Sequence, residues 1–151
     1  MKERHGNLID LALAGDFDVI VHGCNCFCTM GAGIARAIRD QFPEAFAADQ
    51  ATVPGDRDKL GSYSAATLVR SGRELTLVNA YTQYHFHGPG VLVDYSALRQ
   101  VFTAIARDFP GKRIGYPKIG AGLAGGDWTV IAAIIDETLI GIDHSLVLLP
   151  R

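Results

Sequence analysis

The chain has 151 residues, 48% of them hydrophobic, which suffices for one ordinary domain with a real core, so we expect a single domain over residues 1–151. A formal net charge of −2 at pH 7 argues against a basic surface that grips phosphate backbones, and we expect no sequence-specific nucleic-acid binding. No apolar run is long enough to cross a bilayer and residues 1–5 are too polar to begin a secretory signal, so we expect a cytoplasmic protein without a membrane partner.

The first part of the chain alternates between strand and helix patterns. Residues 17–22 form a β-branched run before a cysteine- and glycine-containing loop, which predicts a buried parallel strand, and only residues 1–6 remain for a strand before it. After Gly31-Ala32-Gly33, apolar residues recur at helical spacing until Pro43 stops them. The polar segment 53–61 is predicted to be a surface excursion within the same domain.

The second part begins with a predicted hairpin, whose strands at 63–69 and 74–80 flank a Ser71-Gly72-Arg73 turn. A polar and aromatic stretch over 81–90 follows, before a helix that Asp94 or Ser96 caps. The remaining predicted elements are a strand at 113–116, a glycine-rich loop at 117–126, a helix at 127–138 and a closing strand at 144–149.

Strands that alternate with helices, together with one hairpin, indicate an α/β fold. We expect a three-layer α/β/α sandwich with a mixed, mostly parallel central sheet. Ligands of such sheets sit at the carboxyl ends of the strands, and both glycine-rich loops follow predicted strand ends. The two loops are therefore expected to meet over one cleft.

The three cysteines, Cys24, Cys26 and Cys28, lie within five residues of one another, which is too close for a disulfide framework between distant elements. With His22 they form an H-x-C-x-C-x-C pattern that invites a zinc interpretation. Structural zinc sites usually separate paired ligands by two or more residues and add a distant second pair, which this chain does not have. We expect no metal, and small residues that pack in a loop.

The two glycine loops favour a diphosphate ligand. Gly31-Ala32-Gly33 precedes a predicted helix, whose exposed backbone N–H groups stabilise an anion without a lysine. Gly120-Ala121-Gly122 lets backbone approach the same anion from the other side. The P-loop motif is absent and Gly31-x-Gly33 lacks a third glycine three residues on, so ATPase and dehydrogenase functions are disfavoured.

The order of the motifs resembles the macrodomain family over nearly the whole chain, from Gly6 to the final strand. The motifs are Val21-His22-Gly23-Cys24-Asn25 followed by Met30-Gly31-Ala32-Gly33-Ile34-Ala35, and Pro117-Lys118-Ile119-Gly120-Ala121-Gly122-Leu123 followed by Gly126-Asp127-Trp128. The resemblance is closest to the branch of ADP-ribose-1″-phosphate phosphatases and terminal ADP-ribose hydrolases. It implies a macrodomain fold, ADP-ribose or ADP-ribose-1″-phosphate as ligand, ADP-ribosylated macromolecules as further partners, and no cofactor.

The resemblance also implies the ligand contacts, residue by residue. Asn7 stands where an aspartate usually accepts a hydrogen bond from adenine, and an asparagine carbonyl can still accept one. The expected contacts are Asn7 and the backbone of Leu8 at the adenine, Asn25 at the distal ribose, Met30, Gly31, Ala32, Gly33 and Ile34 on one side of the diphosphate, and Ile119, Gly120, Ala121, Gly122 and Leu123 on the other. Gln83, His85 and Lys118 are further candidates around the distal ribose and its phosphate, by their places in the loops. A solvent-exposed His85 and a Lys118 that points to water explain these two residues as well.

His22 and Asp127 are the candidate catalytic residues. Phosphatase-like macrodomains carry a histidine where His22 stands, and a histidine of near-neutral pKa can transfer a proton to a leaving oxygen or activate water. A histidine that is bonded to its surroundings and only orients the loop explains the same residue equally well. Asp127 either positions water or, more simply, caps the helix that follows it.

The resemblance leaves three functions open. The leading hypothesis is hydrolysis of the phosphate of ADP-ribose-1″-phosphate, the runner-up is a non-catalytic reader that sequesters ADP-ribose, and the third is hydrolysis of ADP-ribosyl protein, DNA or acetyl ester. Hydrolases of the closest branch use a lysine at the end of the central strand and an acid after the second loop, and we assign these places to Ala80 and Ala124. Ala35 likewise replaces the aspartate of another hydrolase branch. These alanines favour the reader.

Overall fold

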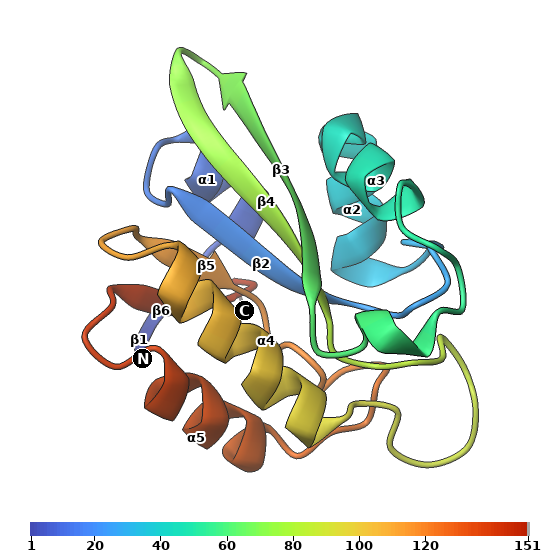
Figure 1. The fold of residues 1–151 in the computed structure, drawn as a ribbon. Helices are drawn as coiled ribbons and strands as arrows, with labels where there is room; N and C mark the ends of the chain where they lie inside the picture. The colour runs from blue at the N-terminus through green and yellow to red at the C-terminus, as the bar shows by residue number, and fades with distance from the viewer. Residues whose placement is uncertain (151) are drawn as a thin grey trace.

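The computed structural model describes residues 1–150 as one mixed sheet between two layers of helices (Figure 1). The sheet has the strand order β1-β6-β5-β2-β4-β3, in which only the β3–β4 pair is antiparallel. The strands are β1 (Lys2–His5), β2 (Val19–Cys24), β3 (Tyr63–Arg70), β4 (Arg73–Tyr81), β5 (Ile114–Tyr116) and β6 (His144–Leu148). The helices are α1 (Leu8–Leu13), α2 (Gly33–Gln41), α3 (Pro43–Gln50), α4 (Tyr95–Asp108) and α5 (Trp128–Thr138), with a short 3₁₀ turn, η1 (Arg57–Lys59). The α/β/α sandwich predicted from the sequence is confirmed.

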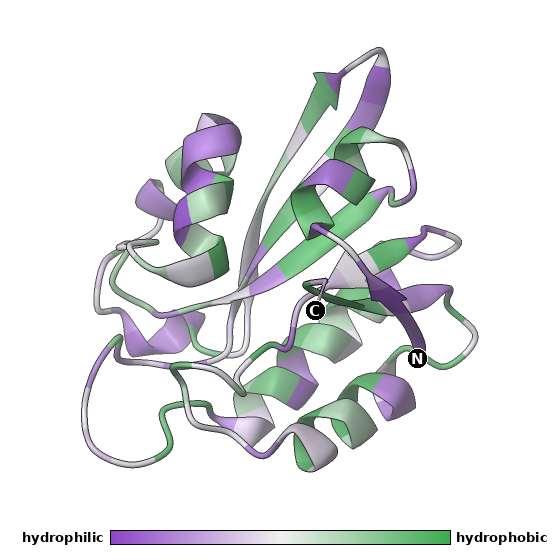
Figure 2. Cartoon of the chain, turned by 180° about the vertical axis from the view of Figure 1, so that it is seen from behind, coloured by the Kyte–Doolittle hydropathy of each residue, from purple (hydrophilic) through white to green (hydrophobic). Residues whose placement is uncertain are grey.

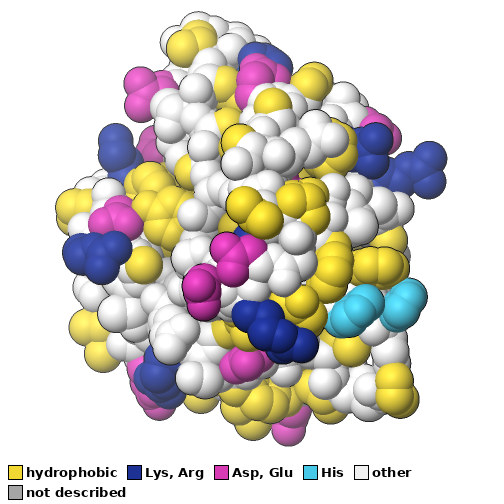
Figure 3. Space-filling model, turned by 45° about the vertical axis from the view of Figure 1, so that its right-hand side comes forward, with side chains coloured by type: hydrophobic (Ala, Val, Ile, Leu, Met, Phe, Trp, Pro, Cys, Tyr) yellow, Lys and Arg dark blue, Asp and Glu magenta, His cyan; other side chains and the backbone are white. Residues whose placement is uncertain are grey.

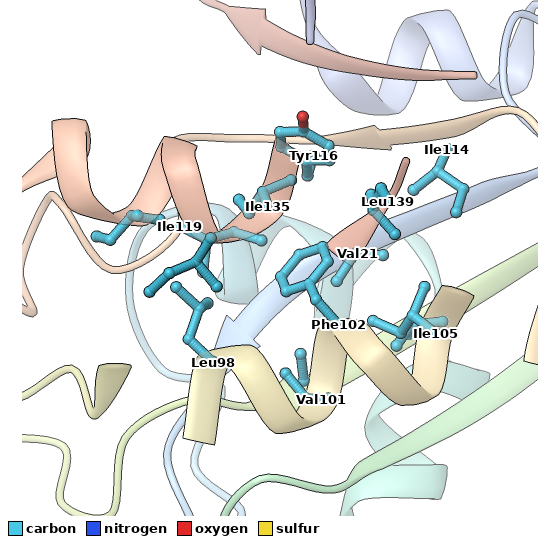
Figure 4. Close-up of a cluster of buried hydrophobic side chains, with 14 of the residues drawn as sticks. Val21, Leu98, Val101, Phe102, Ile105, Ile114, Tyr116, Ile119, Ile135 and Leu139 are labelled. Atoms are coloured by element: carbon cyan, nitrogen blue, oxygen red, sulfur yellow. The ribbon is translucent and has the colours of Figure 1, made fainter. Parts of the chain in front are cut away.

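The core has two halves, one on each face of the sheet. Figure 4 shows Val21 of β2 close to Phe102 of α4 and Ile135 of α5, and all three side chains are fully buried. Ile20, the neighbour of Val21, packs on the opposite face with the residues of α1, α2 and α3. Successive strand residues point to opposite faces of the sheet, and helices cover both faces at β2. Both sets of side chains are therefore apolar, which explains the continuous apolar run in the sequence.

The first strand, β1, has little hydrophobic signal because all four of its side chains are exposed. It is the purple, hydrophilic strand beside the N-terminus in Figure 2. Its backbone pairs in parallel with β6 along its whole length, from Lys2 opposite Ser145 to His5 opposite Leu148. Backbone hydrogen bonds at the sheet edge therefore hold a strand that hydropathy does not reveal.

Two features of the region between residues 42 and 61 were not predicted. Pro43 ends α2 as expected, but it is also the first residue of a new helix, α3. Proline suits that position because the first N–H of a helix needs no partner within the helix. In the predicted surface excursion, Lys59 of η1 is only 8% exposed and lies beneath the loop that follows β2.

The β3–β4 hairpin and the parallel pairing of β2 fix the edge at which a site forms. Ser71 and Gly72 both have positive φ, as a tight two-residue turn requires, and the turn sets the register down to Tyr63 opposite Ala80. Since β4 pairs in parallel with β2, and β2 with β5, the loops after all three strands emerge at one edge of the sheet. No helix within residues 1–150 is long and apolar enough to span a membrane.

Candidate ligand-binding cleft

A cleft of about 590 Å³ opens at the carboxyl ends of β2, β4 and β5. Its lining comes from the loop after β2 and the start of α2, from the end of α3, from the stretch after β4, and from the loop after β5. The two glycine-rich loops thus lie across one cavity from each other, as the sequence predicted. Of the described residues that line it, Asp49 is the only acidic one and Lys118 the only basic one.

The first wall is the turn that leads into α2. Met30 is buried and has a φ of +40°, and Gly33 has a φ of +57°, so the chain bends sharply just before the helix. Ala32 is the N-cap residue and supplies no side-chain hydrogen bond to the helix. The first N–H groups of α2 are therefore left without a side-chain cap at the positive end of the helix dipole, where an anion is stabilised.

The second wall is the loop after β5, in which the glycines have different roles. A Cβ on Gly120 would lie 2.8 Å from Cγ2 of Val93, and the φ of Gly120 is +75°, so this glycine is required by packing and backbone conformation. A Cβ on Gly122 would meet no atom within 4 Å. Gly122 and the exposed Leu123 border the cleft, whereas Ala121 is not part of its lining.

Asn25 and Gln83 line the cleft near β2 and β4, and both side chains also brace their loops. The amide oxygen of Asn25 accepts a hydrogen bond from the backbone N–H of Phe27 at 2.8 Å, and its Nδ2 donates to Oγ1 of Thr29 at 2.7 Å. Nε2 of Gln83 donates to the carbonyl oxygen of His85 at 2.8 Å. The predicted contact residues at this end are thus held in fixed orientations.

His22 does not reach the cleft. Its side chain is fully buried on the α1–α3 face of the sheet, where Nε2 lies 2.7 Å from Oδ1 of Asn79 on β4. Asn79 in turn donates a hydrogen bond to the carbonyl oxygen of Ala45 in α3. Burial lowers the pKa of His22 from 6.5 to about 4, so the ring is neutral near pH 7. The structure corrects the prediction that His22 lies at the ligand and favours the alternative of an orienting histidine.

Asp127 is the N-cap residue of α5. Its Oδ1 accepts a hydrogen bond from the backbone N–H of Thr129 at 2.9 Å, its own N–H donates to the hydroxyl of Tyr95, and it does not line the cleft. This geometry favours capping over the positioning of water.

Besides Ala121, three predicted contacts lie outside the cleft lining. Asn7 caps α1 by accepting a hydrogen bond from the N–H of Asp10 at 3.0 Å, and Leu8 is a buried core residue. Both follow β1 and so lie at the same sheet edge as the cleft. His85 packs 4.7 Å from the ring of Phe27, and its neighbour Phe86 borders the cleft instead.

An aromatic rim flanks the cleft on the β4 side. Figure 3 shows histidine side chains next to hydrophobic ones on this face of the molecule. The rings of His85 and His87 stack at a centroid distance of 4.9 Å, and Phe86 is 46% exposed. The long polar and aromatic stretch of the sequence therefore forms a packed wall.

Comparison with known proteins identifies the fold. No family model matches the chain. It is 37% identical over 141 residues to an uncharacterized 17.5 kDa protein of Enterobacteria phage T4 encoded in the tk-vs intergenic region, covering 90% of this chain and 88% of that one. The macrodomain of Thermus aquaticus DarG superimposes with a TM-score of 0.74 at 20% identity, over 99% of this chain and 97% of that one. The chain has the macrodomain fold.

A third similarity is to Thermosipho africanus DarTG in complex with ADP-ribose, with a TM-score of 0.71 at 15% identity. It covers 91% of this chain and 39% of that one. At such identities the similarity of solved structures shows the fold alone.

The macrodomain's cleft carries no side chain from position 80. Ala80 is fully buried in the half of the core that α4 and α5 cover, and a lysine there would point into apolar packing. The side chain that follows β4 into the cleft is that of Gln83. The assignment of the catalytic-lysine position to Ala80 is therefore wrong, since strand alternation turns that residue away from the ligand. Ala124 does line the cleft.

The three cysteines pack around the base of the first loop. Cys24 lines the cleft, and burial together with the charge of Asp49 raises its thiol pKa, while burial raises that of Cys26 to about 11. Sγ of Cys28 lies 3.2 Å from the carbonyl oxygen of Asp49. Within residues 1–150, no group of three or more histidine, cysteine or acidic side chains is arranged to hold a metal ion.

No motif or pattern in the sequence indicates Asp49 as a site residue. This aspartate is 1% exposed and lines the cleft from the last turn of α3, a helix that was not predicted. Its position in the sequence, between alanines and a glutamine, resembles any exposed helical residue. Helical periodicity after Pro43 could have identified Asp49, because it places this residue one helical turn after Ala45, on the same buried face.

Proposed function

We propose that this macrodomain binds ADP-ribose in the cleft between its two glycine loops. The observation that carries the proposal is the uncapped N-terminus of α2 on one wall and the unobstructed backbone at Gly122 on the other. Backbone N–H groups from two sides suit a diphosphate, because each can donate a charge-assisted hydrogen bond. Lys118, exposed at the base of the second wall, adds one positive charge.

The remaining parts of the cleft suit the sugars and base of such a ligand. Asn25 and Gln83 provide a polar end near β2 and β4, where hydroxyl groups can be hydrogen-bonded. Asn7 and Leu8 lie beyond the opposite end, after the edge strand β1, where we place the adenine. The complex of Thermosipho africanus DarTG with ADP-ribose supports a ligand of this class.

Hydrolysis of ADP-ribose-1″-phosphate is a separate proposal that rests on the sequence resemblance alone. It lacks the acid–base group first assigned to it, because His22 is buried and neutral. A reader that sequesters ADP-ribose requires no such group. Binding without turnover is therefore the function that the geometry supports best, ahead of phosphate release and of hydrolysis of ADP-ribosylated protein, DNA or acetyl ester.

One panel of ligands tests these alternatives. Calorimetry with ADP-ribose is expected to give a dissociation constant in the micromolar range, roughly −7 to −9 kcal/mol, and AMP is expected to bind far more weakly. The same protein is incubated with ADP-ribose-1″-phosphate and with ADP-ribosylated protein and DNA, and product release is measured. No heat and no thermal shift with millimolar ADP-ribose would remove the proposed function.

A further inference from the structure

Asp49 lies at the end of the cleft that β4 forms. It belongs to α3, which packs on β3 and β4, and it shares the cleft lining with Asn25 and Gln83. The two walls that suit a diphosphate come from the loops after β2 and β5, nearer the middle of the sheet. A group that reaches Asp49 must therefore be the part of a ligand that extends beyond the diphosphate toward β4.

One oxygen of Asp49 has no hydrogen-bond partner among the described residues. Oδ1 accepts a hydrogen bond from the hydroxyl of Tyr81 at 2.7 Å, whereas Oδ2 is buried and unpaired. A buried acceptor without a partner destabilises the fold, and more so when it is charged. Because Asp49 is part of the cleft lining, a donor group of a bound ligand is a candidate for the missing partner.

The helix itself disfavours an acid at this place. A carboxylate in the last turn of a helix faces the negative end of the helix dipole. Burial raises the pKa of Asp49, which the hydrogen bond from Tyr81 and the charge of Lys59 counteract in part. Lys59 is itself buried, and its Nζ donates to Oγ1 of Thr52 at 2.8 Å. Two buried charges are thus arranged behind the polar end of the cleft.

We propose that Asp49 is a specificity-determining contact, whose Oδ2 accepts a hydrogen bond from a sugar hydroxyl at the end of the ligand distal to the nucleoside. The inference rests on the proposed function and deepens it. A hydroxyl supplies the missing donor, whereas a phosphate at the same place brings a second negative charge against a buried carboxylate. The cleft therefore selects ADP-ribose with a free distal ribose over ADP-ribose-1″-phosphate.

The test is calorimetry with three ligands and the parent protein, Asp49→Asn and Asp40→Asn. The asparagine keeps the size of Asp49 and an acceptor for Tyr81, but removes the charge and one of the two acceptor oxygens. Asp40 is an exposed residue of α2, so its variant controls for the loss of one negative charge. ADP carries the adenine and the diphosphate but lacks the distal ribose.

The parent protein is expected to bind ADP-ribose at least about tenfold more tightly than ADP-ribose-1″-phosphate. Asp49→Asn is expected to weaken ADP-ribose by about tenfold, to strengthen the 1″-phosphate, and to leave ADP within about twofold. A role in the fold alone would change all three ligands in the same direction. The Asp40→Asn variant is expected to match the parent protein.

Two results overturn the assignment. The first is equal or tighter binding of the 1″-phosphate by the parent protein, which decides the matter even if Asp49→Asn does not fold. The second is a folded Asp49→Asn variant that binds ADP-ribose as the parent does, or that loses ADP to the same extent, which would place Asp49 at the nucleoside. Absence of binding by all three ligands would instead overturn the proposed function.

Discussion

Replacing Gly122 by valine is expected to abolish ADP-ribose binding while leaving the macrodomain folded. A Cβ at this position meets no atom within 4 Å, so the side chain projects into open space beside the cleft. We expect the free energy of unfolding to change by no more than about 0.5 kcal/mol, as for other surface substitutions. In the cleft, the same side chain occupies the space through which backbone approaches the diphosphate.

The size of the effect on binding follows from the hydrogen bonds that the ligand would lose. A backbone N–H bonded to a charged group contributes about 1.5–3 kcal/mol, so the loss of two such bonds weakens binding by at least about 3 kcal/mol. That loss corresponds to a factor of more than 100 in the dissociation constant. Gly122→Ala, with one methyl group instead of three carbons, is expected to have a smaller effect in the same direction.

Gly120→Val is the matched control, because it adds the same side chain two residues earlier. Its Cβ would lie 2.8 Å from Val93 and 3.2 Å from Ile131, on a residue with a φ of +75°. This variant is expected to lower the thermal unfolding midpoint, whereas Gly122→Val is not. The reasoning is refuted if Gly122→Val unfolds at the parent temperature and binds ADP-ribose with the parent affinity in calorimetry.

Three further outcomes are expected. Because the pKa of His22 falls from 6.5 unfolded to about 4 folded, the unfolded chain binds more protons between these values, and stability is lost as pH falls through that window. Urea unfolding should show that the free energy of unfolding falls by about 3 kcal/mol between these two pH values because of His22, and that this fall is absent in His22→Asn. The same pH dependence in both proteins would contradict the prediction. His22→Ala should leave Asn79 without its partner and lower stability, yet change ADP-ribose affinity by less than about 1.4 kcal/mol, a factor of ten; a larger loss in a folded variant would place His22 at the ligand. Lys118→Ala should weaken ADP-ribose binding by about three- to tenfold at low salt and less at high salt, and a salt-independent effect would argue against a charge contribution.

Much of the fold could be predicted because local patterns report it directly. The β-branched run before Cys24, the apolar spacing after Gly33 and the Ser71-Gly72 turn each depend on neighbours within a few residues, and all three have their expected structures. The same holds for the two glycine loops, since both follow parallel strands and therefore emerge at one edge of the sheet.

Errors arose where a side chain's direction decides its role. The sequence places His22 and Ala80 at strand ends beside the cleft, but the pleat turns His22 toward α3 and Ala80 toward α4. When a residue at a strand end is assigned one position too early or too late, its side chain is placed on the wrong face of the sheet. Nearness in sequence to a binding loop therefore does not establish contact with the ligand.

The sequence by itself thus determined the strands, the helices α2, α4 and α5, the two glycine-rich loops and the family that they resemble, since these depend on periodicity and turn chemistry along the chain. Only the tertiary structure decided which side chains enter the cleft. Asp49 and Lys59 are ten residues apart in an unremarkable polar segment, and they become buried charges behind the cleft because α3 packs against β3 and β4. Burial of a polar group depends on what covers it, and that covering comes from strands that follow later in the chain.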